Sequence, residues 1–96
     1  MIEIKWSPRA LRDIKRLYDF IYEKNPEAAK SAASAIRIGI ENLGSFPEIG
    51  KPIENLPTNF REINIPFGAR GYIARYYLEE EVLVVLAIRH YLEVFL

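Results

Sequence analysis

The chain contains no cysteine, and this absence excludes disulfide bonds, thiolate chemistry and the usual structural zinc sites. A chain without disulfides suits a reducing compartment. No spacing of residues typical of a metal site is present either, and no glycine-rich phosphate loop follows a predicted strand. We therefore expect neither a metal nor a cofactor.

Long apolar runs are also missing. No run approaches the roughly 20 residues that are needed to cross a bilayer. The opening residues Met1–Lys5 lack the apolar core of a signal peptide. We expect a cytoplasmic protein that makes no membrane contact.

An excess of charge of one sign is absent, because 13 lysines and arginines are balanced by 13 acidic residues. Net charge therefore provides no general attraction to phosphates. Half of the 96 residues are apolar, and the length is below that at which chains divide into domains. Residues 1–96 should therefore form a single domain.

The first residues predict a strand followed by a helix. Apolar and polar residues alternate over 2–6, which is typical of a half-buried strand. Ser7 is a good helix cap and Pro8 suits the first helical position, so a helix should cover residues 8–24. Its cationic residues are typical of an ordinary solvated helix face: Arg9, Arg12 and Arg16.

A second helix should follow with almost no linker. Asn25 and Pro26 again supply a polar cap followed by proline, so this helix should fold back as an antiparallel hairpin. Gly44 is the expected C-cap. Residues 46–53 combine turn formers with apolar residues, which predicts an ordered loop held against the core.

The second half of the chain predicts a meander of three strands. They should be formed by residues 59–67, by residues 72–78 and by the run that begins at Val82. This last strand is almost entirely apolar up to Ile88, which indicates a position inside the sheet with cover on both faces. The helical hairpin covers one face, and the other face is left with apolar surface for a partner.

Arginines on the predicted meander are the first candidate site. Arg61, Arg75 and Arg89 should lie on neighbouring strands, where they could clamp a phosphate or a carboxylate. In the alternative interpretation Arg75 is simply ion-paired, with Glu62 or Glu93 as its partner.

The Arg-His-Tyr sequence near the end of the chain is the second candidate. Adjacent residues of a strand point to opposite faces, so Arg89 and Tyr91 should share one face and His90 should take the other. His90 is either a hydrogen-bonded structural histidine or a general acid/base, because imidazole is the usual group for proton transfer near neutral pH. No serine accompanies it in a hydrolase arrangement.

These segments together resemble the RelE/ParE superfamily of toxins from type II toxin–antitoxin systems, often labelled plasmid stabilisation proteins. The resemblance covers nearly the whole chain. It rests on the segments WSPRALRDIKRLYDFI, FPEIGKPI, FREINIP and VLVVLAIRH, in this order. It implies an α+β fold of the order β-α-α-β-β-β, with the helical hairpin packed on a small curved antiparallel sheet.

The resemblance implies one of two activities. ParE-like members bind DNA gyrase and are not known to be nucleases, whereas RelE-like members cut messenger RNA on the ribosome. The AIRH segment, the long hairpin and the scarcity of lysine on the meander favour the ParE-like branch. In the RelE-like alternative, the endoribonuclease would use basic residues with a terminal Tyr or His: Arg61, Arg75, Arg89, His90 and Tyr91.

A cognate antitoxin is the partner that the resemblance implies. An antitoxin segment should wrap the groove of the helical hairpin and the sheet face that bears Ile73, Arg75 and Tyr77. Acidic residues of that segment would pair with Arg75 and Arg89. The assembly would be a toxin–antitoxin hetero-oligomer or a homodimer.

The end of the chain departs from the family pattern. ParE-like chains commonly continue into a polar, basic tail, and here Leu92, Val94, Phe95 and Leu96 replace it. This apolar tail would continue the strand, dock on the core, or contact an antitoxin or a second copy. A third interpretation of the whole chain is therefore a non-toxic remnant that still binds an antitoxin.

Overall fold

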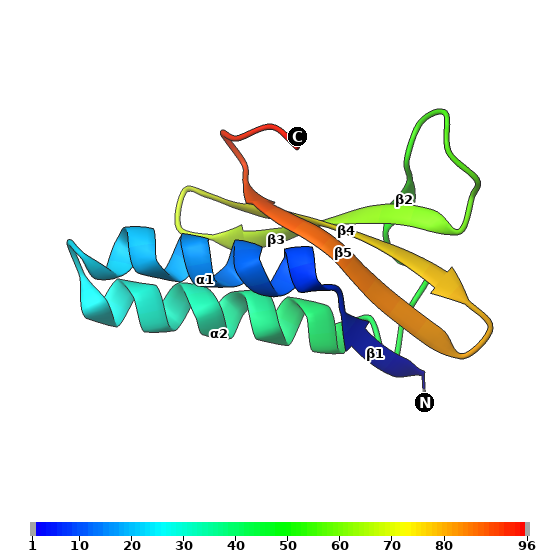
Figure 1. Cartoon of the computed structure of the whole chain (residues 1–96), viewed down its shortest axis with the longest axis horizontal. Coiled ribbons are helices and arrows are strands. Elements are labelled where there is room, and N and C mark those ends of the chain that lie inside the picture. Colours follow the sequence, from blue (N-terminus) through cyan, green and yellow to red (C-terminus); the bar gives the residue numbers. More distant parts are fainter. Residues whose placement is uncertain (1, 96) are drawn as a thin grey trace.

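A strand, two helices and four further strands follow one another in the computed structural model, which describes residues 2–95. In chain order they are β1 (Glu3–Trp6), α1 (Pro8–Tyr22), α2 (Pro26–Asn42), β2 (Lys51–Pro52), β3 (Phe60–Phe67), β4 (Arg70–Glu79) and β5 (Val82–His90). The helices lie against one face of the sheet, and residues 91–95 lie on the other side (Figure 1). The predicted α+β class is confirmed, with the two-residue β2 as an additional strand.

The five strands pair in the order β1-β5-β4-β3-β2. Tight turns join β3 to β4 and β4 to β5, so these neighbours run antiparallel. β1 pairs parallel with β5, with Glu3 opposite Val82 and Trp6 opposite Val85. The sheet is therefore mixed rather than wholly antiparallel. β1 and β5 can run parallel because no hairpin joins them: the two helices and strands β2 to β4 lie between them in the chain.

Both helices begin where the sequence predicts. Ser7 Oγ accepts a hydrogen bond from Ala10 N–H at 3.0 Å, and Asn25 Oδ1 accepts one from Ala28 N–H at 3.1 Å. Each cap satisfies a donor that has no partner within its helix. α1 ends at Tyr22, slightly before the predicted end, because Asn25 is already extended in order to cap α2.

The predicted glycine cap of α2 is wrong. The cap residue is Leu43, which has a right-handed helical conformation. The last turn tightens, with Leu43 N–H donating to the Ile40 carbonyl and Gly44 N–H donating to the Glu41 carbonyl. A Cβ on the buried Gly44 would lie 3.1 Å from the Glu41 carbonyl oxygen, so small size is what favours glycine here.

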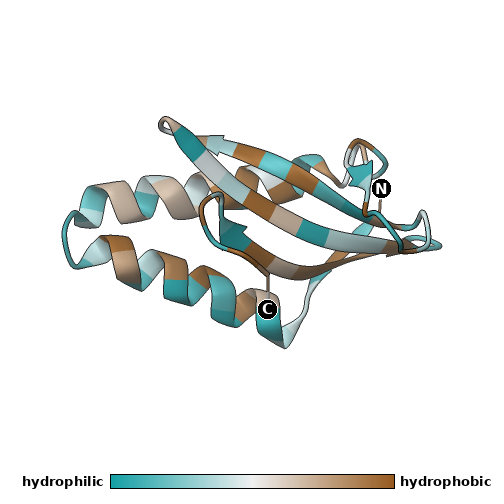
Figure 2. Ribbon diagram, turned by 90° about the horizontal axis from the view of Figure 1, so that it is seen from above, coloured by the Kyte–Doolittle hydropathy of each residue, from teal (hydrophilic) through white to brown (hydrophobic). Residues whose placement is uncertain are grey.

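The core lies between the helices and the sheet. Apolar residues are frequent along the strands of the sheet (Figure 2), and one face of the sheet packs on the helices. The large buried members come from both layers: Leu17, Ile36, Ile40, Leu43, Ile65, Tyr72, Tyr76, Leu83, Val85 and Ile88. Within residues 2–95, neither helix is long and apolar enough to cross a membrane.

Tyr76 anchors the loop between α2 and β3 to this core. Its hydroxyl donates to the Pro47 carbonyl at 2.9 Å and accepts a hydrogen bond from Gly50 N–H at 3.0 Å. These bonds confirm the expectation of an ordered loop. Burial raises the pKa of Tyr76, and the hydrogen bond from Gly50 and the positive charge of Arg61 partly offset this effect.

Side chains of α1 and of its N-cap form hydrogen bonds with the backbone of β5 where β1 no longer pairs with it. β1 pairs only with the first part of β5, so the second part has no neighbouring strand on that side. Ser7 Oγ donates to the Leu86 carbonyl at 2.9 Å, and Asp13 Oδ2 accepts a hydrogen bond from Ile88 N–H at 2.8 Å. Two polar side chains of the helix thus replace a missing strand.

A β-bulge lies in the same part of β5. Arg75 is opposite Ala87 in the ladder, whereas the next residue, Tyr76, is opposite Val85. Leu86 therefore has no partner on β4. An extra residue of this kind reverses the alternation of side chains along a strand. Each residue after Leu86 therefore points to the face opposite to the one that uninterrupted alternation would give it.

Asp13→Ala should destabilise the fold, because the part-buried Ile88 N–H would lose its acceptor. A donor left without a partner costs about 1–3 kcal/mol, and the free energy of unfolding in urea should fall by this amount. Asp13→Asn keeps a carbonyl oxygen and should lose less. Asp19→Ala removes only an exposed ion pair with Lys15 and should lose under about 1 kcal/mol. Equal losses for all three variants would show that Asp13 has no special role.

Stability should fall at alkaline pH because of Tyr76. An unfolded tyrosine ionises near pH 10, whereas the raised pKa lets the buried residue keep its proton to higher pH. Above about pH 10 the unfolded chain therefore binds fewer protons, and the free energy of unfolding decreases as the pH rises. Tyr76→Phe should remove this contribution and lose about 1–3 kcal/mol at neutral pH with its hydrogen bonds.

Urea denaturation between about pH 7 and 11 measures both effects of this substitution. The difference in unfolding free energy between the wild type and Tyr76→Phe should shrink as the pH rises. Tyr22→Phe is the matched control, since it removes an exposed hydroxyl and should change the stability at neutral pH by less than about 0.5 kcal/mol. A difference for Tyr76→Phe that stays constant across this range would contradict the role of its ionisation.

Candidate functional site

The face of the sheet that points away from the helices carries the residues predicted to bind a partner. Ile73 lies opposite Arg89 in the ladder between β4 and β5. Arg75 and Tyr77 follow Ile73 at alternate positions of β4. The structure thus brings Ile73, Arg75, Tyr77 and Arg89 onto one surface, which we call the open sheet face.

Arg75 is ion-paired on this surface. Its Nε lies 3.2 Å from Oε2 of Glu62 on β3, and the Arg75 side chain is 37% exposed. Glu62 was one of two partners considered from the sequence, and the other, Glu93, pairs instead with Arg16. A partly exposed pair adds little stability, but it orients the guanidinium across the face.

Arg89 holds the part of the chain that follows β5. Its Nη1 donates to the carbonyl oxygens of His90, Tyr91 and Glu93. These bonds turn residues Tyr91–Phe95, which we call the carboxy-terminal strap, back over the open sheet face (Figure 1). The carbonyl of the last residue of β5 and two carbonyls beyond it thereby share one donor.

Phe95 is the residue with which the strap docks. The centroid of its ring lies 4.3 Å from Cζ of Arg75 and 4.9 Å from Cζ of Arg89. The described part of the apolar tail neither continues β5 nor docks on the core. It folds onto the sheet on the face opposite the helices. Leu96, which belongs to the same predicted tail, lies outside the described residues.

Arg61 lies on the helix-facing side of the sheet. It is opposite Tyr76 in the ladder between β3 and β4. Its Nη1 donates to the carbonyl oxygens of Glu48 at 3.2 Å and of Gly50 at 2.8 Å. Arg61 therefore fastens the loop before β2 rather than joining the arginines of the open sheet face.

His90 lies on the helix-facing side as well, opposite Tyr72. The two rings meet edge to face with centroids 5.6 Å apart, and His90 Nδ1 accepts a hydrogen bond from Leu92 N–H at 3.2 Å. Burial, followed by the nearby carboxylate of Glu93, raises the pKa of Tyr72. Tyr72 is therefore protonated at neutral pH and is no proton acceptor for a substrate.

Tyr91 lies in the turn after β5 and is exposed. Cζ of Arg70 lies 5.5 Å from the centroid of its ring. The residues predicted for a nuclease are thus divided: Arg61 and His90 lie on one side of the sheet, and the two arginines of the open sheet face lie on the other. Among residues 2–95 no group of His, Asp or Glu side chains has the make-up of a metal site.

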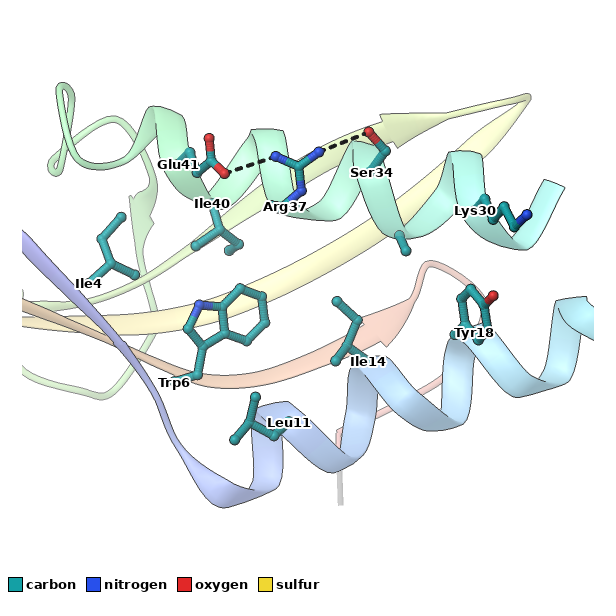
Figure 3. A pocket seen from close by; sticks show the side chains of 11 residues that line it. Ile4, Trp6, Leu11, Ile14, Tyr18, Lys30, Ser34, Arg37, Ile40 and Glu41 are labelled. Carbon is teal, nitrogen blue, oxygen red and sulfur yellow. Dashed lines mark hydrogen bonds and ion pairs between the residues drawn. The ribbon is translucent and has the colours of Figure 1, made fainter. Parts of the chain in front are cut away.

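A groove of about 660 Å³ between the two helices and β1 is the second surface predicted for a partner. Its lining is mainly apolar, and the Trp6 ring reaches into the space between the helices (Figure 3). The apolar lining comes from three elements: Ile4, Trp6, Leu11, Ile14, Tyr18, Ala33 and Ile40. Arg37 and Glu41 close one rim, with Arg37 Nη1 3.1 Å from Glu41 Oε1.

Two residues of α1 near the open sheet face were missed by sequence reasoning. Arg9 and Arg16 fit the pattern of a solvated helix face. In the structure Arg16 Nη1 lies 2.7 Å from Glu93 Oε2, and Arg9 Cζ lies 6.0 Å from the centroid of the Phe95 ring. The tail after β5 was the available signal for these contacts. Its carboxylate, Glu93, needs a cationic partner, and its apolar ring, Phe95, needs a surface that covers it.

The sequence matches the family profile described as ParE toxin of type II toxin–antitoxin system, parDE, over residues 4–95. It is similar to Toxin RelE3 of Caulobacter vibrioides, with 32% identity over 93 residues that cover 97% of this chain and 98% of that protein. It is also similar to Toxin RelE1 of the same organism, with 37% identity over 87 residues that cover 91% of this chain and 90% of that protein.

The fold is similar to a solved structure described as the chromosomal ParDE TA system from P. aeruginosa. The TM-score is 0.76 and the identity 20%, and the match covers 94% of this chain and 96% of that chain. At this identity the likeness concerns the fold alone. Both names, ParE and RelE, occur among these relatives. The comparisons therefore do not distinguish gyrase binding from cleavage of messenger RNA.

Proposed function

The chain belongs to the ParE toxin family of type II toxin–antitoxin systems, and from this premise we propose that it acts by binding DNA gyrase and is neutralised by a cognate antitoxin. The class of toxin follows from family membership. The proposal concerns the mode of action, which is binding rather than cleavage, and the identity of the target.

The division of the nuclease candidates between two faces is the observation that carries this proposal. Cleavage of RNA needs a base for the 2′-hydroxyl, an acid for the leaving oxygen and cations on the phosphate, all within reach of one bond. Arg61 and His90 lie on the helix-facing side, whereas Arg75 and Arg89 lie on the open sheet face. One phosphate could not contact both pairs, so this arrangement favours a binding protein.

The open sheet face also has the composition of a protein-binding surface. Arginine and aromatic residues are enriched in such interfaces, and here Arg75 lies between Ile73 and Tyr77 on β4. The Tyr77 ring stacks on Phe60 of β3 with centroids 5.3 Å apart. Together with the groove between the helices, this face offers an antitoxin segment two apolar surfaces with arginines beside them.

A ribosome-dependent endoribonuclease is the second candidate, because the curated relatives are named RelE. It would use Arg75, Arg89, His90 and Tyr91 on messenger RNA. A non-toxic module that still binds an antitoxin is the third candidate. The apolar residues after β5, which stand where ParE-like chains commonly have a polar, basic tail, are the feature that suggests this last candidate.

Purified protein should inhibit DNA supercoiling by gyrase at micromolar concentration, and the cognate antitoxin should relieve the inhibition. The measurement is the supercoiling of a relaxed plasmid, with heat-denatured protein as the control. Primer extension on translated messages after induction in cells tests the alternative. Cuts linked to codons, together with unaffected gyrase, would overturn the proposal.

Arg75→Glu should weaken the complex with the cognate antitoxin by roughly tenfold or more, because it replaces a cation that faces an acidic segment by an anion. Calorimetric titration measures the affinity. Arg12→Glu makes the same change of net charge on an exposed part of α1 and is the matched control. If both variants bind as the wild type does while circular dichroism shows an intact fold, the antitoxin does not use the open sheet face.

A further inference from the structure

Glu93 ties the carboxy-terminal strap to α1. One carboxylate oxygen, Oε2, lies 2.7 Å from Nη1 of Arg16. The other, Oε1, accepts a hydrogen bond from His90 N–H at 2.8 Å. The strap therefore presents an anion to the helix at the edge of the open sheet face.

Phe95 fills the space between three arginines. The centroid of its ring lies 4.3 Å from Cζ of Arg75, 4.9 Å from Cζ of Arg89 and 6.0 Å from Cζ of Arg9. All three distances fall within the roughly 6 Å at which a guanidinium and an aromatic ring attract each other. We call these three arginines, together with Arg16, the arginine cage.

Two other side chains of the strap, Leu92 and Val94, contribute little to holding it down. Leu92 and Val94 point into solvent, with exposed fractions of 68% and 74%. Arg16 and Glu93 are themselves 47% and 40% exposed. Exposed ion pairs and single cation–π contacts are each weak, so the side-chain contacts hold the strap less firmly than the bonds from Arg89 to its backbone.

We propose that the arginine cage is a binding site for an acidic, aromatic-bearing peptide segment of a partner protein, and that the strap occupies this site in cis. The partner segment binds only when the strap has left. The inference rests on the proposed contact between an acidic segment and the open sheet face, and it adds how access to that face is controlled, whichever target the toxin acts on.

The present occupant identifies the chemistry of the ligand. The strap offers a carboxylate to Arg16, a phenyl ring to the guanidinium of Arg75 and a row of backbone carbonyls to Arg89. Only a peptide combines these three features, with the spacing Glu-x-Phe. A nucleic acid offers no such row of backbone carbonyls, and its binding relies on surplus cations, whereas Arg75 is already paired with Glu62.

The strap also leaves the cage incompletely satisfied. Nε of Arg89 is buried and has no hydrogen-bond partner among residues 2–95. A partner segment that places one more acceptor beside Arg89 would gain a bond that the strap does not make. This additional bond would help a partner segment to displace the strap, which is tethered to the site by the chain.

The test is a titration of the full-length protein, labelled with ¹⁵N, with a pentapeptide of the strap sequence, Tyr-Leu-Glu-Val-Phe, blocked at both ends. The Nε–H resonance of Arg75 reports binding, because the aromatic ring shifts it. Phe95→Ala should bind the peptide at least about fivefold more tightly than the wild type, since a competing closed state lowers the apparent affinity in proportion to its population. Glu93→Gln, which keeps an acceptor for His90 N–H, should bind more tightly as well.

Three controls make the result specific. Leu92→Ala changes an exposed side chain of the same strap and should bind the peptide as the wild type does. Adding Arg75→Met to Phe95→Ala should weaken binding at least about fivefold, in line with the loss of a cation–π contact. A peptide in which Gln replaces Glu and Ala replaces Phe should not bind.

Equal affinity of the wild type, Phe95→Ala and Glu93→Gln for the peptide would overturn the proposal, because the strap would then not compete. So would the absence of binding to any of them at millimolar peptide. Tighter binding of a short RNA than of the peptide by Phe95→Ala would assign the cage to nucleic acid instead. If Phe95→Ala fails to fold by circular dichroism, the comparison of Glu93→Gln with Leu92→Ala decides.

Discussion

The fold depends on how the edge of β5 is completed where β1 stops. Buried backbone groups without partners are costly, and at this edge α1 supplies the partners. Ser7 and Asp13 provide the donor and the acceptor that Leu86 and Ile88 need. Ser7 also follows β1 directly and is the N-cap of α1. This one residue therefore links the end of β1, the start of α1 and the bulge at Leu86. This arrangement fixes α1 where its exposed arginines reach the strap.

The same stretch of β5 decides on which face Arg89 lies. Leu83 and Val85 face the helices, and simple alternation from them would place Arg89 on the helix-facing side as well. The extra residue Leu86 reverses the alternation. Ile88 therefore enters the core and Arg89 joins the open sheet face. One inserted residue thus places Arg89 beside Ile73 on the open sheet face, apart from the side chains that form the core.

Features set by neighbours in the sequence were predictable, and those set by distant contacts were not. Ser7 and Asn25 indicate the starts of the two helices because capping acts within one turn. Alternation along β4 is enough to place Ile73, Arg75 and Tyr77 on one face. The end of α2 at Leu43, the parallel pairing of β1 and the bulge at Leu86 depend on contacts between separate elements. The docking of Phe95 is the clearest case, since it requires arginines from α1, β4 and β5 to meet.

The arginines near the open sheet face differ from those of a surface built for a polyanion. Arg75 is matched by Glu62, Arg16 by Glu93, and Arg89 by backbone carbonyls. A polyanion binds through surplus charge, with a strong dependence on salt. Arginines that already have partners instead favour a ligand that puts an equivalent group at the same position: a carboxylate where Glu93 lies and an aromatic ring where Phe95 lies. Any group left unpaired after an imperfect replacement is penalised. In the proposed mode of binding, selectivity for one protein partner would therefore come from the matching of individual groups and not from the net charge, which is zero.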